Sequence, residues 1–208
     1  MYWILGIFGS LIGVWAAYTR LYEGGLDEPE YRIVDRIMNI EIRRYESFVI
    51  ASTKPHLAGK NGRSQGFRTL AGYIFGSNQP NEKLSMTAPV LQQKDSGETI
   101  PMTAPVVTSS QNTTMAFVMP SGRKLDDLPT PLTPDVSLKE VNWELMAAIR
   151  FSGGGKQTEF EAREKKLLKA LNRVGKSVRG PALYAQYNSP YAFPLLRRNE
   201  VIIPINSD

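Results

Sequence analysis

A five-residue sequence, Met-Thr-Ala-Pro-Val, occurs twice in this chain, at Met86–Val90 and again at Met102–Val106. Both copies lie in strand-forming stretches, and the turn-forming residues Lys94–Gly97 lie between them. Proline has no backbone N–H, so neither Pro89 nor Pro105 can occupy a fully paired position in the middle of a sheet. We therefore predict a hairpin with an edge, a bulge or a bend at each proline. Two such bends would curl the sheet enough to make a small barrel or a deep cleft.

The order of predicted elements repeats along the chain. In the first half a strand at residues 40–52 precedes a helix, which we expect to end at Gly76 and Asn78, and three short strands follow around the pentapeptides and residues 113–120. The second half starts after the proline-rich connector at residues 126–134. It contains strands, a helix and closing strands at residues 136–141, 143–153, about 158–174, 182–188 and 200–205. Two halves, each with a helix laid on antiparallel strands, indicate an α+β domain with pseudo-twofold character.

Local signals place the two helices. In the first, Phe67, Leu70, Ala71 and Ile74 recur at the spacing of one helical face. In the second, Thr158 and Glu161 have the spacing of a capping box that would open the helix.

The first 19 residues contain no charged side chain before Arg20. As a helix they would be about 28 Å long, close to the hydrocarbon core of about 30 Å, and aromatic residues lie near both ends. We predict a single-pass N-terminal membrane anchor at residues 1–19, with its membrane side undetermined, and a linker at residues 20–30. A signal peptide, cleaved or uncleaved, and a helix that belongs to the fold are the alternatives.

Composition restricts the remaining possibilities. The 208 residues are 42% hydrophobic and 22% charged, which is typical of a globular protein, and the chain has no cysteine for a disulfide, a thiolate metal site or a cysteine nucleophile. The formal net charge is +5, a surplus that suits a solvated basic surface, nucleic acid, anionic lipid or a ligand with carboxylates. Because helix-turn-helix, zinc and RNA-binding patterns are missing from the sequence, we do not expect nucleic acid to be the partner.

Several short motifs together resemble the SOUL haem-binding protein family over about residues 31–206, which we predict to be one SOUL-like domain. They occur in the family's order and lie at residues 41–46, 72–78, 83–90, 102–106, 117–121, 128–131, 150–153, 186–190 and 195–200. The resemblance implies a distorted antiparallel β-barrel flanked by two helices and built from a βαββ duplication.

The resemblance also implies non-catalytic binding of haem or another tetrapyrrole. Such a ligand needs an apolar surface and basic groups for its propionates. The first helix offers both, and the predicted site consists of Arg63, Phe67, Arg68, Leu70, Ala71 and Ile74. At the position before Tyr73, where animal members that bind haem by this helix carry a basic residue, this chain has Gly72.

We do not expect an iron ligand. His56 is the only histidine, and it follows Pro55 in a polar stretch typical of an exposed loop. Some family members are proposed to use a histidine in the segment that matches Arg43–Glu46, which contains none here. We interpret the methionines of the strand-forming segments, Met86, Met102, Met115 and Met119, as core residues that fill gaps.

Other functions remain as alternatives. The sequence contains no nucleophile elbow, no phosphate-binding loop and no pairing of carboxylates with histidines, so we predict that the protein is not an enzyme. The related gyrase-inhibitory-protein-like fold suggests a sensor or carrier of other amphipathic aromatic molecules. A membrane-tethered interaction protein that uses residues 196–200 as a surface patch is the third possibility. We expect Arg197, Arg198 and Glu200 in that patch to form structural ion pairs instead. No protein partner is indicated.

Overall fold

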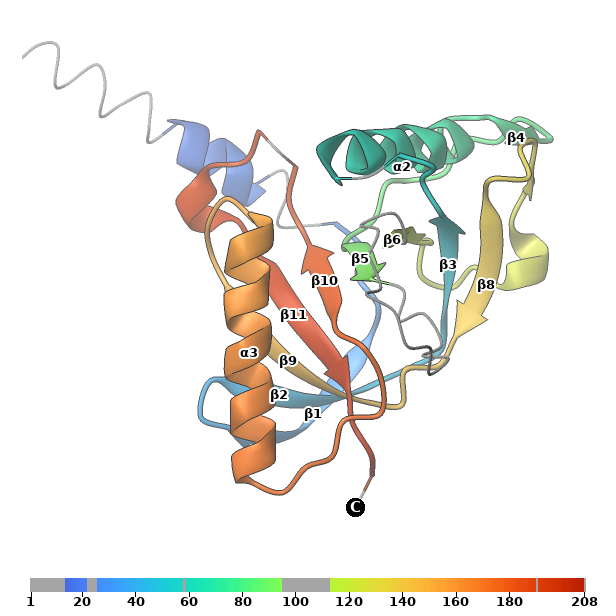
Figure 1. The fold of residues 1–208 in the computed structure, drawn as a ribbon. Helices are drawn as coiled ribbons and strands as arrows, with labels where there is room; N and C mark the ends of the chain where they lie inside the picture. The colour runs from blue at the N-terminus through green and yellow to red at the C-terminus, as the bar shows by residue number, and fades with distance from the viewer. Residues whose placement is uncertain (1–13, 22–25, 58, 95–112, 190, 208) are drawn as a thin grey trace, which may run out of the picture.

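The computed structural model describes residues 14–21, 26–57, 59–94, 113–189 and 191–207. Within these residues, nine strands form one antiparallel sheet that curls strongly, and the helices α2 (Gly59–Ile74) and α3 (Gln157–Arg173) each pack on a different part of it (Figure 1). This architecture confirms the predicted α+β class with a curled antiparallel barrel and two flanking helices.

The sheet has the strand order β1-β2-β9-β11-β10-β5-β6-β3-β8. Its strands are β1 (Tyr31–Ile37), β2 (Ile40–Tyr45), β3 (Phe48–Thr53), β5 (Val90–Lys94), β6 (Thr113–Val118), β8 (Ser137–Val141), β9 (Leu145–Phe151), β10 (Leu183–Gln186) and β11 (Asn199–Pro204). A second, two-stranded sheet pairs β4 (Asn78–Gln79) with β7 (Thr130–Pro131), and two 3-10 helices are η1 (Leu125–Asp127) and η2 (Pro194–Leu196).

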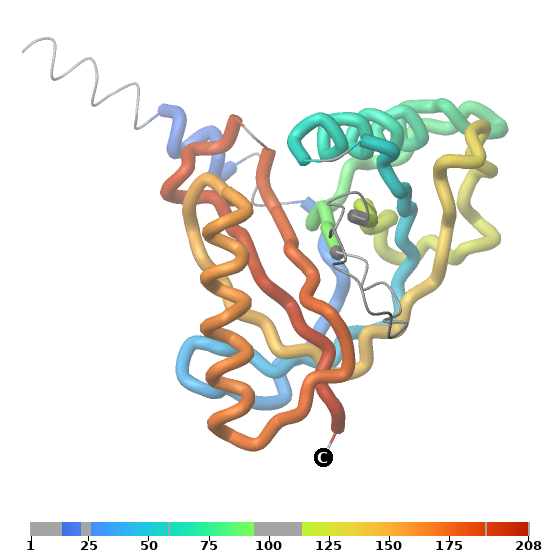
Figure 2. Tube along the Cα trace, viewed as in Figure 1, coloured from blue at the N-terminus to red at the C-terminus, as the bar shows by residue number. Residues whose placement is uncertain are grey.

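The predicted βαββ duplication is visible in this order. The unit β3-α2-β5-β6 corresponds to β9-α3-β10-β11, and the two units meet where β5 pairs with β10. The strand that precedes each unit pairs with the other unit, because β2 joins β9 and β8 joins β3. Figure 2 shows the two units side by side, each with its own helix. This exchange of outer strands ties the halves into one sheet.

The single strand predicted at residues 40–52 is wrong, because the chain forms two strands there. β2 ends at Tyr45 and β3 begins at Phe48, and the two strands belong to opposite halves of the sheet. Tyr45 and Phe48 pack in the same core cluster although they are three positions apart, so the alternation of a continuous strand is broken between them. β1 was not predicted from the sequence, because most of its residues are exposed and give no alternating pattern.

Local contacts explain where the helices begin and end. The predicted end of α2 is confirmed: Gly76 has a φ of 118° and the Asn78 side-chain amide donates to the Tyr73 carbonyl at 2.7 Å. The N-cap of α3 predicted at Thr158 is wrong by two positions, because Lys156 is the N-cap and the helix begins at Gln157. The Glu159 carboxylate, not Glu161, accepts a hydrogen bond from the Lys156 backbone N–H at 2.7 Å.

Three apolar clusters form the core. α3 packs on β2, β9 and β11 through a first cluster, and α2 packs on β3 and β6 through a second. Because side chains alternate along a strand, the other face of the same strands contributes a third cluster inside the curl of the sheet. We call this the inner face, and the face covered by the helices the outer face.

The twin pentapeptides are described in part. Pro89 lies immediately before β5, a position where the missing N–H interrupts no ladder, and Thr87 donates its hydroxyl to the Val118 carbonyl of β6. The second copy and the turn between the copies lie outside the described residues.

The predicted membrane anchor is wrong. Among the residues that the structure describes, no helix combines the length and the apolar character that crossing a bilayer requires. Residues 14–21 of the segment form a short helix that contacts the domain. Trp15 Nε1 donates to the Tyr191 carbonyl at 2.7 Å and the Phe193 N–H donates to Thr19 Oγ1 at 2.9 Å, so this helix packs on the fold. Residues 1–13 lie outside the described part of the chain.

The proposed linker also contacts the domain. The Asp27 carbonyl accepts from the Ala88 N–H at 3.0 Å, and Glu28 pairs with Arg198 at 2.8 Å. The domain boundary at residue 31 and the signal-peptide alternative stay predictions.

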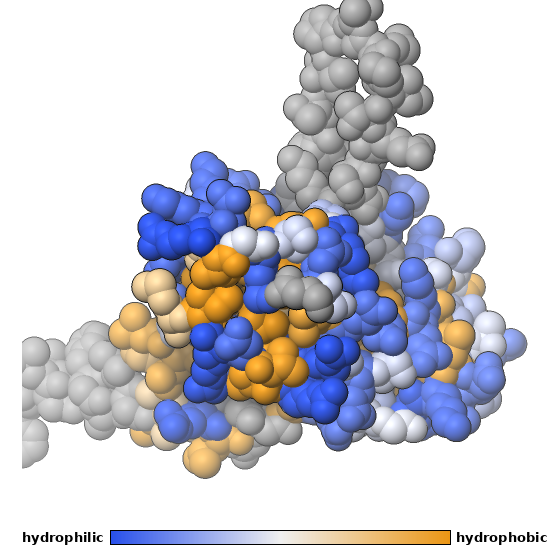
Figure 3. Space-filling model, turned by 90° about the horizontal axis from the view of Figure 1, so that it is seen from below, coloured by the Kyte–Doolittle hydropathy of each residue, from blue (hydrophilic) through white to orange (hydrophobic). Residues whose placement is uncertain are grey.

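The surface mixes apolar and hydrophilic residues. Seen from below, apolar residues gather near the centre of the face and hydrophilic residues surround them (Figure 3). Exposed apolar side chains occur on several elements, including Val34 of β1 and Val174 after α3 as well as Phe67 of α2. Exposure alone therefore does not identify a ligand site.

Two adjacent leucines on α3 test the packing of the second half. Leu167 is fully buried, whereas Leu168 is 37% exposed. We expect Leu167→Ala to lower the free energy of unfolding by about 2–5 kcal/mol because it opens a cavity under the helix, and Leu168→Ala to lower it by less than about 1 kcal/mol. Urea unfolding measures both values. Equal losses would contradict the assigned helix face.

Candidate functional site

The six predicted site residues on α2 separate into two groups. Leu70 and Ile74 are buried and pack in the cluster between the helix and β3 and β6. They attach the helix to the sheet and present no surface to a ligand. Arg63, Phe67 and Arg68 are exposed and Ala71 is half-buried, so these four residues lie on the accessible side of the helix.

The accessible side of α2 carries a row of residues that we call the α2 face: Arg63, Phe67, Ala71 and Phe75. They are four positions apart, which places them one above another on a helix. Phe67 is 39% exposed and Phe75 is 58% exposed. Sequence reasoning missed Phe75, which lies just past the end of the helix, although its spacing from Phe67 signals the same row.

Neighbouring residues keep the α2 face open and rigid. The Phe67 ring meets the Phe117 ring of β6 edge to face, with 5.3 Å between centroids, so one side of the exposed ring is supported by the core. Gly72, beside Ala71, adds no side chain, and a Cβ there would meet only Ser77 Oγ at 3.5 Å. Ala71 and Gly72 therefore add little side-chain volume to the part of the helix between Phe67 and Phe75.

Charge at the α2 face is basic and unneutralised. Within the described part of the chain, the side chains of Arg63 and Arg68 make no ion pair. Both guanidinium groups can therefore receive an acidic ligand group. His56 is exposed and its Nε2 lies 3.8 Å from Asp135 Oδ1, which confirms the predicted surface histidine. No cluster of three or more potential metal-ligating residues occurs in the described ranges.

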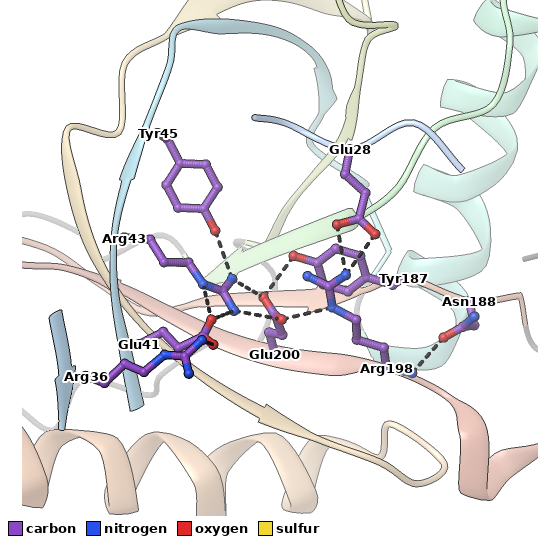
Figure 4. Close-up of polar contacts among 9 residues, drawn as sticks. All are labelled: Glu28, Arg36, Glu41, Arg43, Tyr45, Tyr187, Asn188, Arg198 and Glu200. Atoms are coloured by element: carbon purple, nitrogen blue, oxygen red, sulfur yellow. Dashed lines mark hydrogen bonds and ion pairs between the residues drawn. The ribbon is translucent and has the colours of Figure 1, made fainter. Parts of the chain in front are cut away.

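A second polar site lies on the inner face, at the other half of the sheet. Glu200 of β11 is fully buried there, and its two oxygens accept four hydrogen bonds (Figure 4). Oε2 accepts from Arg43 at 2.6 Å and Tyr187 at 2.9 Å, and Oε1 accepts from Arg43 at 3.1 Å and Arg198 at 2.9 Å. We call these four residues the Glu200 network.

Both arginines of the Glu200 network also bind other groups besides Glu200. All five N–H groups of Arg43 have acceptors, which are Glu200, Glu41 and the Tyr45 hydroxyl. Arg198 pairs with Glu28 and stacks its guanidinium 3.8 Å from the centroid of the Tyr187 ring. The predicted structural ion pair of Arg198 with Glu200 is thereby confirmed. Arg197 Nε donates to the Ala192 carbonyl at 2.9 Å.

Electrostatics fix the charge states in this network. Burial would raise the pKa of Glu200, but hydrogen bonds and charge from Arg43, together with Arg198 and Tyr187, outweigh it and keep that pKa below its ordinary value. Burial and the Glu200 charge raise the pKa of the Tyr187 hydroxyl. Glu200 is therefore ionised and Tyr187 neutral at physiological pH.

A cavity of about 290 Å³ lies beside the Glu200 network. Its walls come from β1, the turn between β1 and β2, and strands β2, β9 and β11. The lining residues are Tyr31, Arg36, Met38, Asn39, Glu41, Arg43, Ala148, Arg150, Arg198 and Glu200. Sequence reasoning did not find this cavity, because its residues are far apart in the chain and meet only after the strands pair.

Fold and sites together define a duplicated α+β domain with a basic and apolar helix face and an inner polar cavity. The family model described as SOUL heme-binding protein matches the chain in two segments, residues 26–98 and 91–204. The chain belongs to the SOUL family. The human protein named Heme-binding protein 2 is 31% identical over 164 residues, which cover 77% of this chain and 75% of that protein.

Solved structures share the fold at much lower identity. The C-terminal domain of EcmrR matches with a TM-score of 0.57 and 8% identity, over 86% of this chain and 99% of that one. An uncharacterized conserved protein from Listeria innocua matches with a TM-score of 0.55 and 10% identity, over 91% of this chain and 98% of that one. These likenesses support the curled two-helix architecture and carry no argument about a ligand.

The Glu200 network predicts a defined response of stability to substitution and pH. Glu200→Gln removes the buried carboxylate between Arg43 and Arg198 and leaves Glu41 and Glu28 as their charged partners, so we expect the free energy of unfolding at pH 7 to fall by about 3 kcal/mol. In the parent protein the depressed pKa of Glu200 contributes stability that is complete above the unfolded pKa of about 4.3 and declines as pH falls toward the folded pKa. Urea unfolding from pH 3 to 7 measures both effects.

The difference in the free energy of unfolding between parent and variant should shrink as pH falls below about 4.3, where the unfolded carboxylate of the parent takes up a proton. Glu161→Gln, on the exposed surface of α3, is the control and should leave both curves nearly superposed. A constant difference between parent and Glu200→Gln across the whole pH range would contradict the assigned ionisation.

Proposed function

We propose that this protein binds haem or another tetrapyrrole on the α2 face, without catalysing a reaction, and acts as a carrier or buffer of that ligand. Membership of the SOUL heme-binding family and the similarity to human Heme-binding protein 2 support the ligand class. The observation that carries the location is the exposed row of Phe67, Ala71 and Phe75 with Arg63 at its end.

The chemistry of the α2 face suits a flat, amphipathic acid. A macrocycle would lie across the strip formed by Ala71 and Gly72 and cover the rings of Phe67 and Phe75. Covering about 50 Å² of one ring contributes about 1.2 kcal/mol at 25 cal/mol per Å², which corresponds to nearly a tenfold change in Kd. Arg63 and Arg68 would receive the propionates at the rim, where a solvated ion pair contributes about 0–1 kcal/mol.

Affinity on this face should not depend on iron. The sole histidine, His56, is exposed and lies before α2 rather than in the Phe67–Phe75 row, so we propose no ligand bond from it. Haemin and iron-free protoporphyrin should therefore bind with similar strength. An apolar platform without a positioned base or nucleophile supports binding rather than catalysis.

Substitution on the α2 face tests this proposal. Phe67→Gln removes the supported ring, and we expect it to weaken binding of both haemin and protoporphyrin at least fivefold. Fluorescence quenching titrations of the full chain measure the two values of Kd. Leu70, which belongs to the site predicted from the sequence, is unsuitable for this test because it is buried and a polar residue there would disrupt the packing of the helix on the sheet.

Two control variants make the result interpretable. Leu168→Gln changes a leucine of nearly equal exposure on α3, and His56→Ala removes the only imidazole. Both should bind the two porphyrins within twofold of the parent. Unchanged binding in Phe67→Gln would refute the location, a selective loss of haemin in His56→Ala would refute the unligated mode, and a parent that binds neither porphyrin would refute the ligand class.

A further inference from the structure

We propose that the inner cavity beside the Glu200 network is a second ligand site, specific for a small organic carboxylate with an apolar body. It differs from the α2 face in position, because it lies on the opposite face of the sheet and in the other half of the duplication. At about 290 Å³ it is also at the lower limit of pockets that hold small molecules, so a four-ring tetrapyrrole does not fit.

The charge of the cavity lining favours an anion. Four arginines and two glutamates line it, which leaves a surplus of two positive charges, and Glu28 on Arg198 reduces that surplus to one. The two lining carboxylates are already engaged: Glu41 accepts from Arg36 and Arg43, and Glu200 accepts four hydrogen bonds. Because both acids already accept hydrogen bonds from arginines, the lining favours an anionic ligand over a cationic one.

Arg150 of β9 is the guanidinium that a ligand would meet. It pairs with Glu200 in the register of β9 and β11, yet within the described ranges its side chain makes no ion pair or hydrogen bond, because Glu200 is saturated by other donors. Arg150 is exposed, whereas Arg43 is buried in the same wall. A guanidinium presents parallel N–H groups that match a planar carboxylate in two hydrogen bonds.

The remaining walls suit an apolar body. Tyr31, Ala148 and Met38 line the cavity, and the Tyr31 ring is held in place by the Arg43 guanidinium 4.4 Å from its centroid. The small side chain of Ala148 leaves room on the sheet between β2 and β11, since the strand β9 lies between them. A ligand of one small ring or a short chain, with its carboxylate on Arg150, would contact all of these groups.

The matching place in the other half of the duplication is apolar. In the other half of the duplication, the inner face of β3, β5 and β6 is filled by apolar residues, namely Phe48, Ile50, Leu91, Ala116 and Val118. A buried ion network costs more to desolvate than an apolar core of equal volume. The second half carries a charged network and a cavity at the place where the first half packs apolar side chains, which supports a binding role in addition to the structural role of the network.

Benzoate and its neutral analogue benzamide test this inference on the full chain. We expect benzoate to shift the arginine Nε–Hε NMR signals of Arg43, Arg150 and Arg198 in a saturable titration, and benzamide to bind at least tenfold more weakly because it lacks the charge. Arg150→Gln should weaken benzoate binding at least tenfold and leave protoporphyrin binding unchanged, since the α2 face is intact.

The matched control is Arg44→Gln. Arg44 is an exposed strand arginine like Arg150, but it does not line the cavity, so this variant should bind benzoate within twofold of the parent. Far-ultraviolet circular dichroism checks that both variants keep the fold. Equal weakening by the two substitutions, equal binding of benzamide and benzoate, or no saturable shift with benzoate at millimolar concentration would overturn the proposal.

Discussion

The ion pair between Arg43 and Glu200 joins two strands that are not neighbours in the sheet. Arg43 lies on β2 and Glu200 on β11, 157 positions later, and β9 runs between their strands. Arg198 and Tyr187 complete the carboxylate's partners, and Arg198 extends the network to Glu28 ahead of the first strand. Because a buried charge without its partner is expensive, any arrangement that separates these strands loses several interactions at once. The network therefore specifies how the exchanged strand β2 joins the second half.

The exchange of outer strands explains why the two halves form one domain. If β2 and β8 stayed with the units that follow them, each unit would be a small sheet with exposed edges. Instead β2 pairs with β9 and β8 pairs with β3, so each half is covered by a strand from the other end of the repeat. The curl that follows separates an outer face, where the helices pack, from an inner face. Two chemically distinct surfaces result from one repeated unit, and the apolar and basic groups of α2 are kept away from the buried charges of the second half.

Repetition and local pattern were readable from the sequence, whereas long-range pairing was not. The order of helix and strands in each half, the end of α2 near Gly76 and Asn78, and the ion pair of Arg198 with Glu200 followed from spacing and residue type. The break between Tyr45 and Phe48 could not be predicted in this way, because both flanking segments have high strand propensity. Only the strands with which they pair show that the two segments belong to different halves. The anchor prediction failed for a related reason: Trp15 reads as an interfacial aromatic in isolation, but its ring packs against Phe193, 178 positions away in the sequence.

The two candidate sites also differ in whether local pattern or long-range strand pairing forms them. A helix face is a local feature, so Phe67, Ala71 and the arginines beside them could be named from spacing, although spacing did not show that Leu70 and Ile74 face the sheet. The inner cavity is a property of pairing, since Arg36, Arg150 and Arg198 come together only through three strand contacts. Duplication makes this cavity possible. Both halves contribute apolar residues to the core inside the curl, and the second half adds the buried charged groups and holds Arg150, which has no carboxylate partner among the described residues. Because the neighbouring Glu200 carboxylate is already saturated, the N–H groups of Arg150 are available to bind a ligand.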